Sequence, residues 1–227
     1  MFRESDRAFA NRREAGRELA TRLRQYAGRR DVVVLALPRG GVPVAFEVAD
    51  ALDAELDIFL VRKLGMPGHR EYAIGAIASG GVRVLSHDII RAYAIPADAV
   101  EAITRTEQAE LHRREREYRQ GGTLTNLSGR TVILVDDGLA TGSTMRAAVQ
   151  AVRQQEPSRV IVAVPVGAPS TCEELAGFTD ETVCARTPEP FSAVGQWYLD
   201  FSETTDDEVR MLLHEHATRL RAGARRS

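Results

Sequence analysis

The sequence is short of lysine, of cysteine and of net charge, and each shortage excludes a class of protein. Its 32 acidic and 30 basic residues give a formal net charge of −2, so the strongly basic balance of a dedicated nucleic-acid binder is missing. The cysteines, Cys172 and Cys184, are too few for a disulfide framework and lack metal-ligand spacing. We therefore expect buried free thiols in a reducing compartment. Among the 30 basic residues only Lys63 is a lysine.

Long apolar runs are also missing. No segment approaches the roughly eighteen consecutive apolar residues of a membrane span, and the opening MFRESDRAFANRRE is charged where a secretory signal has an apolar stretch. We expect a cytoplasmic protein with neither a membrane nor a nucleic acid as partner. Since no repeat or low-complexity linker interrupts the 227 residues, we expect residues 1–227 to form a single α/β domain.

Four short apolar runs predict the strands of a parallel sheet. They lack polar alternation, as is typical of strands buried on both faces, and lie at 32–37, 58–61, 131–135 and 160–166. Helix-like stretches follow the first and third of them. This alternation predicts a doubly wound, mainly parallel sheet flanked by helices. Gly80-Gly81 predicts a tight turn between two shorter strands.

Two further helices carry capping signals. Thr205 followed by Glu208 is a capping box, and it predicts a C-terminal helix over 204–222. A similar signal opens a charged segment, which we expect to be a long helical insertion over 88–120. Its ELHRREREYR stretch fits a solvated helix with charge pairs at helical spacing; a flap or an oligomer contact is the alternative. A homo-oligomer is left open.

The stretch TVILVDDGLATGSTMRAAV at 131–149 predicts a phosphate site. A buried strand places Asp136 and Asp137 at its carboxyl end, where open α/β sheets bind ligands. Glycines let backbone N–H groups approach an anion, while hydroxyls and the start of the next helix add donors. We expect a phosphate monoester to bind along this loop, through Gly138, Leu139, Ala140, Thr141, Gly142, Ser143 and Thr144.

The adjacent carboxylates need a different partner, because a phosphate would repel them. Acidic residues beside a phosphate site can accept hydrogen bonds from vicinal sugar hydroxyls or bind a divalent cation that bridges the sugar. A phosphate plus sugar hydroxyls indicates a ribose 5-phosphate. The loop lacks the Gly-Lys-Ser/Thr ending of a Walker loop and the glycines of a dinucleotide fingerprint. The plainer alternative is an Asp-Asp-Gly turn before an ordinary capped helix.

VILVDDGLATGST resembles the 5-phosphoribosyl-1-pyrophosphate (PRPP) signature of the type I phosphoribosyltransferases. Pro38-Arg39-Gly40-Gly41, which follows the first strand, is similar to the family's pyrophosphate loop. The resemblance implies that Arg39, Gly40 and Gly41 bind PRPP, and that Asp136 and Asp137 hold its ribose as positive charge develops during catalysis.

The segment VRKLGMPGHREYAIGAI is similar to the mobile loop of that family. The resemblance implies that Arg62 and Lys63 neutralise the departing pyrophosphate, as a dissociating anion requires. Glu71 lies in the same segment and would accept a proton from the attacking nitrogen or orient it. A plain surface position is the alternative for each of these three side chains.

PEPFSAVGQWYLDFSE resembles the hood that covers the base in the purine members, and we expect a small hood over 187–203. The resemblance implies that Phe191 stacks on the acceptor and that Asp200 lies beside the base and a metal ion. Trp197 and Tyr198 are alternative stacking groups, and a place in the core is the alternative for each aromatic ring. Ala140 stands, as in adenine-type members, where hypoxanthine–guanine members carry an aspartate, which argues against hypoxanthine or guanine as the acceptor and leaves a non-purine acceptor open.

These features predict an enzyme that moves ribose 5-phosphate from Mg·PRPP to a nitrogen acceptor, with a nucleobase favoured, and releases pyrophosphate. The implied cofactor is Mg²⁺, and the implied partners are PRPP and a small nitrogenous acceptor. A non-catalytic PRPP-sensing regulator is the main alternative. A pyrophosphokinase that makes PRPP shares the Asp-Asp loop, but the sequence offers no second nucleotide site.

Overall fold

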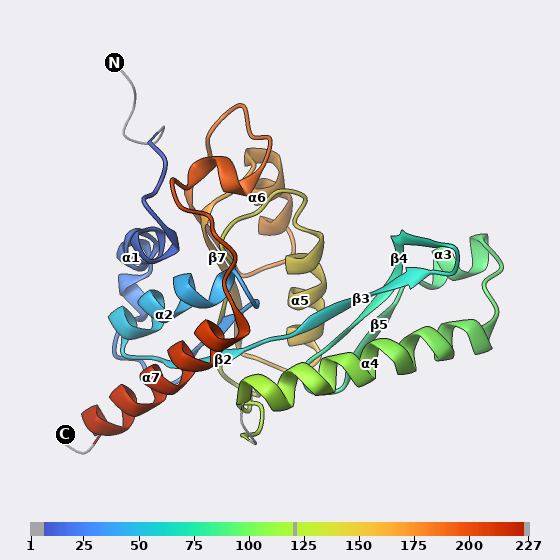
Figure 1. Cartoon of the computed structure of the whole chain (residues 1–227), viewed down its shortest axis with the longest axis horizontal. Helices are drawn as coiled ribbons and strands as arrows, with labels where there is room; N and C mark the ends of the chain where they lie inside the picture. The colour runs from blue at the N-terminus through green and yellow to red at the C-terminus, as the bar shows by residue number, and fades with distance from the viewer. Residues whose placement is uncertain (1–6, 120–121, 225–227) are drawn as a thin grey trace.

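The computed structural model describes residues 7–119 and 122–224, without the side chains of Arg70 and Glu71. The ends of the predicted domain and residue 120 therefore lie outside the described residues. The centre is a five-stranded sheet in the order β2-β1-β6-β7-β8, in which every neighbouring pair is parallel (Figure 1). This confirms the predicted doubly wound fold class. The strands are β1 (Val32–Ala36), β2 (Glu55–Ile58), β6 (Thr131–Val135), β7 (Arg159–Val166) and β8 (Glu181–Arg186).

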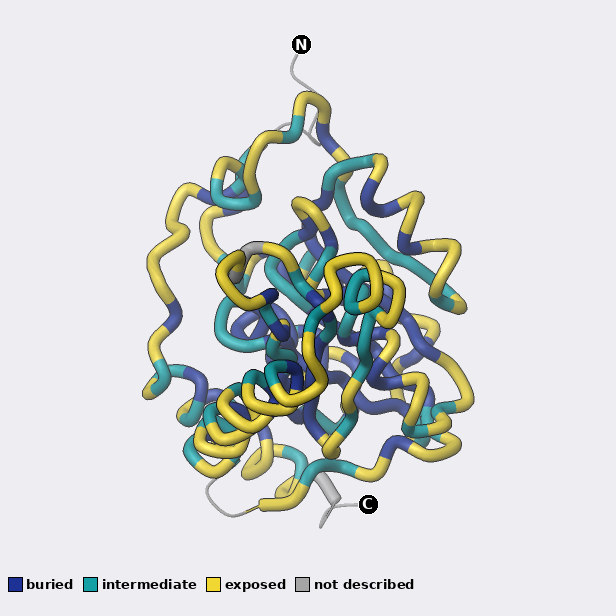
Figure 2. The backbone as a smooth tube through the Cα atoms, turned by 90° about the vertical axis from the view of Figure 1, so that its right-hand side faces the viewer, coloured by how far each residue is buried: buried dark blue, intermediate teal, exposed yellow. Residues whose placement is uncertain are grey.

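Both faces of this sheet are covered, which is why its central strands read as unbroken apolar runs. Alternate strand residues pack into two clusters, with Val34 and Ile133 in one and Leu35 and Leu134 in the other. Figure 2 shows the buried backbone gathered at the centre of the molecule. The first cluster includes residues of α1 (Arg12–Arg22), α2 (Gly41–Leu52) and α7 (Asp206–Ala224), and the second includes residues of α5 (Ser143–Arg153) and α6 (Pro169–Ala176).

An arm over residues 61–119 projects from this body (Figure 1). It holds a three-stranded antiparallel sheet and two helices. The predicted Gly80-Gly81 turn joins the second and third strands of this sheet. The prediction of one strand over 58–61 is wrong, because this apolar run spans the end of β2 and the start of β3. Ile58, Phe59 and Leu60 are buried where the chain passes from body to arm, and Val61 is partly buried, so burial produced the strand-like pattern. The arm elements are β3 (Val61–Met66), β4 (His69–Ala78), β5 (Val82–Leu85), α3 (His87–Ala92) and α4 (Ala97–Arg119).

The segment that resembles a mobile loop is thus ordered as the hairpin of β3 and β4. The charged stretch of α4 carries ion pairs at helical spacing, such as Arg113 with Glu117 at 2.8 Å, as predicted. At its C-terminal end α4 packs on α7, where the Tyr118 hydroxyl donates to Asp206 at 2.5 Å. The arm is therefore fastened to the body at the start of the C-terminal helix.

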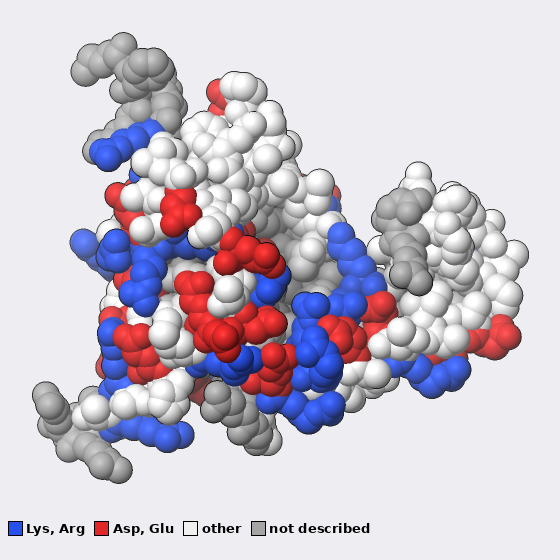
Figure 3. Space-filling model, in the orientation of Figure 1, with Lys and Arg blue, Asp and Glu red and all other residues white. Residues whose placement is uncertain are grey.

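α7 begins with the predicted capping interaction, since Thr205 Oγ1 accepts from the Glu208 N–H at 3.1 Å. The N-terminal segment forms α1 and a short 3₁₀ turn over Arg24–Tyr26. No helix in residues 7–119 and 122–224 is long and apolar enough to cross a bilayer. On the face drawn in Figure 3, acidic and basic side chains are interspersed over the body.

The expectation of free thiols is wrong, because Cys172 and Cys184 form a disulfide. The two residues are only 12 positions apart, yet they belong to α6 and β8, whose Cα atoms approach to 6.6 Å at this point. Such a bond requires a particular approach of two elements, which the spacing of cysteines in a sequence does not reveal. The disulfide fastens the first turn of α6 to the edge strand of the sheet.

Candidate functional site

The site begins with the acid pair at the carboxyl end of β6. The Asp137 N–H donates to Asp136 Oδ1 at 2.9 Å, which turns the first carboxyl back toward the chain. Arg12 Nε donates to Asp137 Oδ2 at 2.9 Å, and the Tyr198 hydroxyl donates to the Asp137 carbonyl at 2.6 Å. Residues from both ends of the chain therefore fix the second acid.

Burial controls the electrostatics of this pair. It raises the pKa of Asp136 well above the ordinary value of 3.8, and the neighbouring Asp137 raises that pKa further. Burial also raises the pKa of Asp137, although the Arg12 guanidinium opposes this shift. Hydrogen-bond donors such as hydroxyl groups stabilise acids that are held in a poorly hydrated position. The pair is therefore suited to accepting hydrogen bonds from the vicinal hydroxyls of a sugar.

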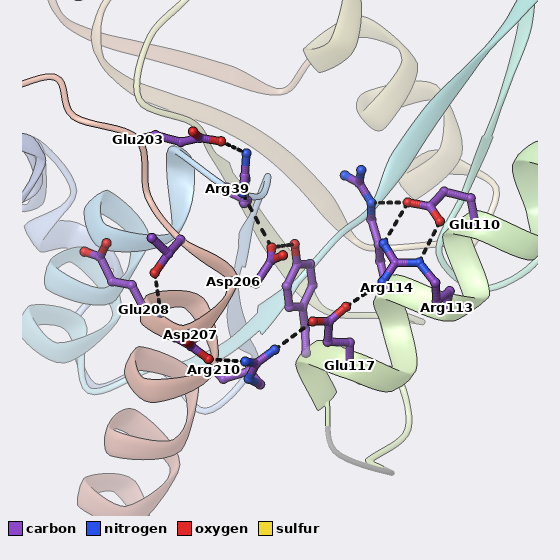
Figure 4. A network of polar contacts seen from close by, with 12 residues as sticks. Arg39, Glu110, Arg113, Arg114, Glu117, Glu203, Asp206, Asp207, Glu208 and Arg210 are labelled. Carbon is purple, nitrogen blue, oxygen red and sulfur yellow. Dashed lines mark hydrogen bonds and ion pairs between the residues drawn. The ribbon is translucent and has the colours of Figure 1, made fainter.

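The Gly-Gly turn after β1 lies directly against the acid pair. A Cβ atom on Gly40 would overlap Asp137 Oδ2, and one on Gly41 would lie 2.7 Å from the Val135 carbonyl oxygen. Neither glycine can therefore be replaced without displacing the acids. The structure thus brings the two predicted PRPP motifs together. Arg39, in the same turn, forms an ion pair with Glu203 and lies 3.8 Å from Asp206 (Figure 4).

The predicted phosphate loop, residues 138–144, is pinned from the side of β7 and α6. The Leu139 N–H donates to the Val166 carbonyl at 2.9 Å, and Thr171 Oγ1 donates to the Ala140 carbonyl at 2.7 Å. Gly142, with φ of +67°, makes the left-handed turn that starts α5. Gly142 caps the helix without a side-chain hydrogen bond, so the first N–H groups of α5 are open to an anion.

Lys63 reaches this loop from the root of the arm, and Arg62 does not. Lys63 Nζ donates to Ser143 Oγ at 2.6 Å, and Ser143 Oγ lies 3.3 Å from Thr141 Oγ1. Successive residues of a strand point to opposite faces, and Arg62 accordingly pairs with Glu107 of α4 at 2.5 Å. The side chain of Glu71 lies outside the described residues.

The three candidate acceptor-binding aromatics have different surroundings. Tyr198 is buried between Phe9 and Phe201, with ring centroids 5.6 and 5.1 Å away, so the structure does not offer its face to an acceptor. Phe191 stacks on Trp197 at 6.4 Å. The Trp197 Nε1 atom is buried and has no hydrogen-bond partner within the described part of the chain.

A pocket of about 600 Å³ opens beside Phe191. It lies between the start of α6 and the first residues of the predicted hood. Ala168, in its wall, donates its N–H to the Leu139 carbonyl at 2.9 Å, so the pocket lies close to the start of the predicted phosphate loop. Its lining is Ala168, Pro169, Ser170, Glu189, Pro190 and Phe191.

Asp200 is exposed and engaged locally. Its carboxylate accepts a hydrogen bond from the Ser202 N–H at 3.0 Å, and this bond lowers the pKa of Asp200. The structure does not bring Asp200 into contact with Asp136 or Asp137, so the three acids do not form one cluster. Among residues 7–119 and 122–224, no group of three or more His, Cys, Asp or Glu side chains could hold a metal ion.

Arg12 is the site residue that sequence reasoning missed. It opens α1 and reaches Asp137, which lies 125 residues further along the chain. Its guanidinium also donates to the Ser202 carbonyl at 2.7 Å and lies 4.0 Å from the centroid of the Phe201 ring. One of several arginines in a charged N-terminal segment carries no local signal of such a contact.

Comparisons with known proteins identify the family of the chain. A family model described as the phosphoribosyl transferase domain matches residues 8–184. A protein of Mycobacterium tuberculosis named "Putative phosphoribosyl transferase" is 48% identical over 217 residues, which is 95% of this chain and 49% of that protein. The chain thus spans about half the length of the curated relatives that it matches.

The chain is also similar to solved structures. TT1426 from Thermus thermophilus is 44% identical and has a TM-score of 0.82, with 92% of this chain and 98% of that chain covered. The AQ2163 protein from Aquifex aeolicus is 12% identical and has a TM-score of 0.50, with 89% and 85% covered, and shows a likeness of fold alone. With a family model over most of its length and close relatives in sequence and structure, the chain belongs to the phosphoribosyl transferase domain family.

Proposed function

We propose that the protein transfers ribose 5-phosphate from Mg·PRPP to a nitrogen acceptor, a nucleobase for preference, and releases pyrophosphate. One observation carries the proposal: the acid pair lies between the Gly-Gly turn and the loop before α5, the two elements that we propose bind anions. On one side Gly40 packs against Asp137. On the other, the loop that follows the acids leads into the open N-terminus of α5, where Lys63 meets Ser143. A sugar bearing phosphate groups at both ends matches this order of donors and acceptors.

In this proposal each element has one task. The N–H groups and hydroxyls at the start of α5 bind the 5-phosphate, and Asp136 and Asp137 accept hydrogen bonds from the ribose hydroxyls. The Gly-Gly turn and Arg39 receive the pyrophosphate, which competes with Glu203 and Asp206 for the Arg39 guanidinium. Most of the rate enhancement then comes from orientation and from positive charge beside the leaving group.

The residues present fit a magnesium ion that arrives with its substrate. The acid pair supplies oxygen atoms, the ligands that Mg²⁺ prefers, but a full protein cage is missing from the described residues. Mg²⁺ commonly keeps few protein ligands and takes the others from phosphates and water. When held there, it would supply positive charge to the departing pyrophosphate. Asp200 remains a predicted metal neighbour only.

The acceptor is proposed to enter the pocket beside Phe191. A flat ring can stack on an aromatic face, and the Glu189 carboxylate lining the pocket can accept hydrogen bonds from N–H groups. These features favour an acceptor with amino or ring N–H donors. The matching test is a panel of purine and pyrimidine bases and small amines.

The decisive experiment follows pyrophosphate release from Mg·PRPP in the presence of that panel. We expect release with at least one acceptor, and loss of it in the double variant Asp136→Asn with Asp137→Asn. The melting temperature of the double variant should be no lower than that of the wild type, because the change removes buried acids without changing shape. Turnover that survives in this variant would contradict the proposed role of the acid pair.

A PRPP-sensing regulator is the second candidate, and the pairing of Arg39 with Glu203 and Asp206 favours it. Arg39 is already paired with these two acids. A ligand that took their place would release Glu203 and Asp206, and this release would signal that the ligand is bound. Stabilisation by Mg·PRPP in a thermal melt, with no pyrophosphate release for any acceptor, would support the regulator over the enzyme.

A further inference from the structure

Arg12 is the point at which three parts of the chain meet. Its Nε atom bonds to Asp137, its Nη1 atom bonds to the Ser202 carbonyl, and its flat face covers the Phe201 ring at 4.0 Å. A Cβ on Gly40 would lie 3.4 Å from Arg12 Nε, so the guanidinium also borders the Gly-Gly turn. The side chain is 11% exposed, and that of Asp137 is 15% exposed.

The guanidinium geometry is essential to this arrangement. A planar fork can donate in two directions while its face rests on an aromatic ring, whereas an ammonium group is a compact point charge on a flexible stem. Arg12 therefore fixes the Asp137 carboxylate and the 201–202 backbone at the same time. The hydrogen bond to a charged and largely buried acceptor is of the stronger kind.

The chain before Arg12 is joined to the hood as well. The Phe9 N–H donates to the Trp197 carbonyl at 2.8 Å, and the Leu199 N–H donates to the Phe9 carbonyl at 2.8 Å. The Asp200 N–H then donates to the Ala10 carbonyl at 3.0 Å. The segment before Arg12 and the segment that contains Trp197 are thus hydrogen-bonded side by side. A shift of the hood would therefore displace Arg12 and, through it, Asp137.

We propose that Arg12 is a positioning residue that holds Asp137 in its ribose-binding orientation and couples that carboxylate to the hood. This inference rests on the proposed function. It places the contribution of Arg12 on the ribose side of the site, away from the phosphate loop, whose contacts are with β7, α6 and Lys63. Loss of Arg12 should therefore weaken a ligand that carries ribose hydroxyls and leave a bare phosphate almost unaffected.

The test measures binding of Mg·PRPP and of inorganic phosphate by calorimetry to the wild type and to matched variants. Arg12→Gln should weaken Mg·PRPP binding by about tenfold or more, the loss expected for one charge-assisted hydrogen bond. Inorganic phosphate binding should change by less than about twofold. Arg12→Lys should fall between wild type and Arg12→Gln, because it keeps the charge and loses the fork.

Arg13→Gln is the control, since Arg13 is the next residue of the same helix. The Arg13 side chain is half-exposed and pairs with Glu47 at 3.3 Å. This variant removes the same charge and should bind both ligands as the wild type does. A free guanidinium salt, added to Arg12→Ala, should restore part of the Mg·PRPP affinity and have no such effect on Arg13→Ala.

Two outcomes overturn the inference while leaving the proposed function intact. If Arg12→Gln binds both ligands as the wild type does, Arg12 has no positioning role. If both affinities fall together and guanidinium restores neither, the residue supports only the fold. A wild type that binds inorganic phosphate but not Mg·PRPP would instead overturn the proposed function, and with it the inference.

Discussion

The direction of the Lys63 side chain determines which part of the site it reaches. Its Nζ atom donates to Ser143 Oγ at 2.6 Å, at the opening of α5, although Lys63 precedes Ser143 by 80 residues in the chain. The neighbouring Arg62 faces α4 and pairs with Glu107. Strand alternation therefore separates two residues that the sequence predicts to act together.

Lys63→Arg should lower turnover on the order of a hundredfold, the size seen when one preorganised electrostatic contact is lost. A guanidinium is broader than an ammonium and would crowd Ser143. Because Lys63 is exposed, the melting temperature should stay close to that of the wild type. Steady-state pyrophosphate release and a thermal melt measure the two effects. An unchanged rate would show that Lys63 is an ordinary surface residue with no role in turnover.

Gly40→Ala should destabilise the fold by about 1–3 kcal/mol, because the new methyl group would overlap Asp137 Oδ2. Gly177→Ala is the matched control, since its Cβ would lie 3.4 Å from the nearest atom in an exposed helix end with a φ of −73°. Urea unfolding compares the two variants. The cost of Gly40→Ala should shrink in an Asp137→Ala background, and equal costs in both backgrounds would contradict the overlap.

Among the elements, the central strands could be predicted from sequence, as could the Gly80-Gly81 turn and the long charged helix of the arm, but the pairing of β3 with β4 could not. β1, β6 and β7 are buried on both faces, and the loop after β6 carries its signals within about a dozen residues. In contrast, β3 and β4 pair with each other outside the main sheet, so their residues lack the unbroken apolar pattern. The segment that resembles a mobile loop also contains Gly68, at the turn of that hairpin.

The disulfide between α6 and β8 also gives a prediction at the level of the element. Reduction should lower the free energy of unfolding by about 2–4 kcal/mol, as is usual when a short closed loop is released. Denaturant unfolding with and without a phosphine reductant measures this change. The double variant Cys172→Ser with Cys184→Ser should be insensitive to the reductant. Equal stability of the wild type in both conditions would show that the bond contributes nothing.

At the scale of the molecule, the charge of the buried Asp136 carboxylate lowers the free energy of unfolding. Burial raises the pKa of Asp136 in the folded state, so the folded protein binds more protons than the unfolded chain above the ordinary value of 3.8. The favourable contribution of this carboxyl is present at low pH and is lost as the pH rises through its folded-state pKa. The free energy of unfolding thus falls over that window because of this group.

Asp136→Asn should accordingly raise the melting temperature at about pH 8, and the gain should shrink toward about pH 4. Asp200→Asn is a control of opposite sign, because the Ser202 N–H lowers the pKa of Asp200 and favours its charged form. Its small loss of melting temperature should stay constant between about pH 8 and about pH 4, because this carboxylate loses its charge only below the ordinary pKa. Thermal melts across this pH range measure both. A gain for Asp136→Asn that is independent of pH would contradict the assignment.

The molecule as a whole also explains which site residues sequence reasoning could find. Asp136, Asp137 and the loop that follows them are contiguous, so their chemistry is visible in one motif. Arg12 reaches Asp137 across 125 residues, and Tyr198 reaches it across 61. Contacts of that kind arise from the folding of both chain ends over the sheet, and no local pattern records them.

The scarcity of lysine has a practical consequence. Within these 227 residues, Lys63 is the single side-chain amine, and it is exposed beside the phosphate loop. An amine-selective reagent therefore modifies one side chain, at the site itself, without any engineered substitution. A reporter dye attached there would follow occupancy of the loop by fluorescence, and protection of Lys63 from the reagent would map which ligands bind.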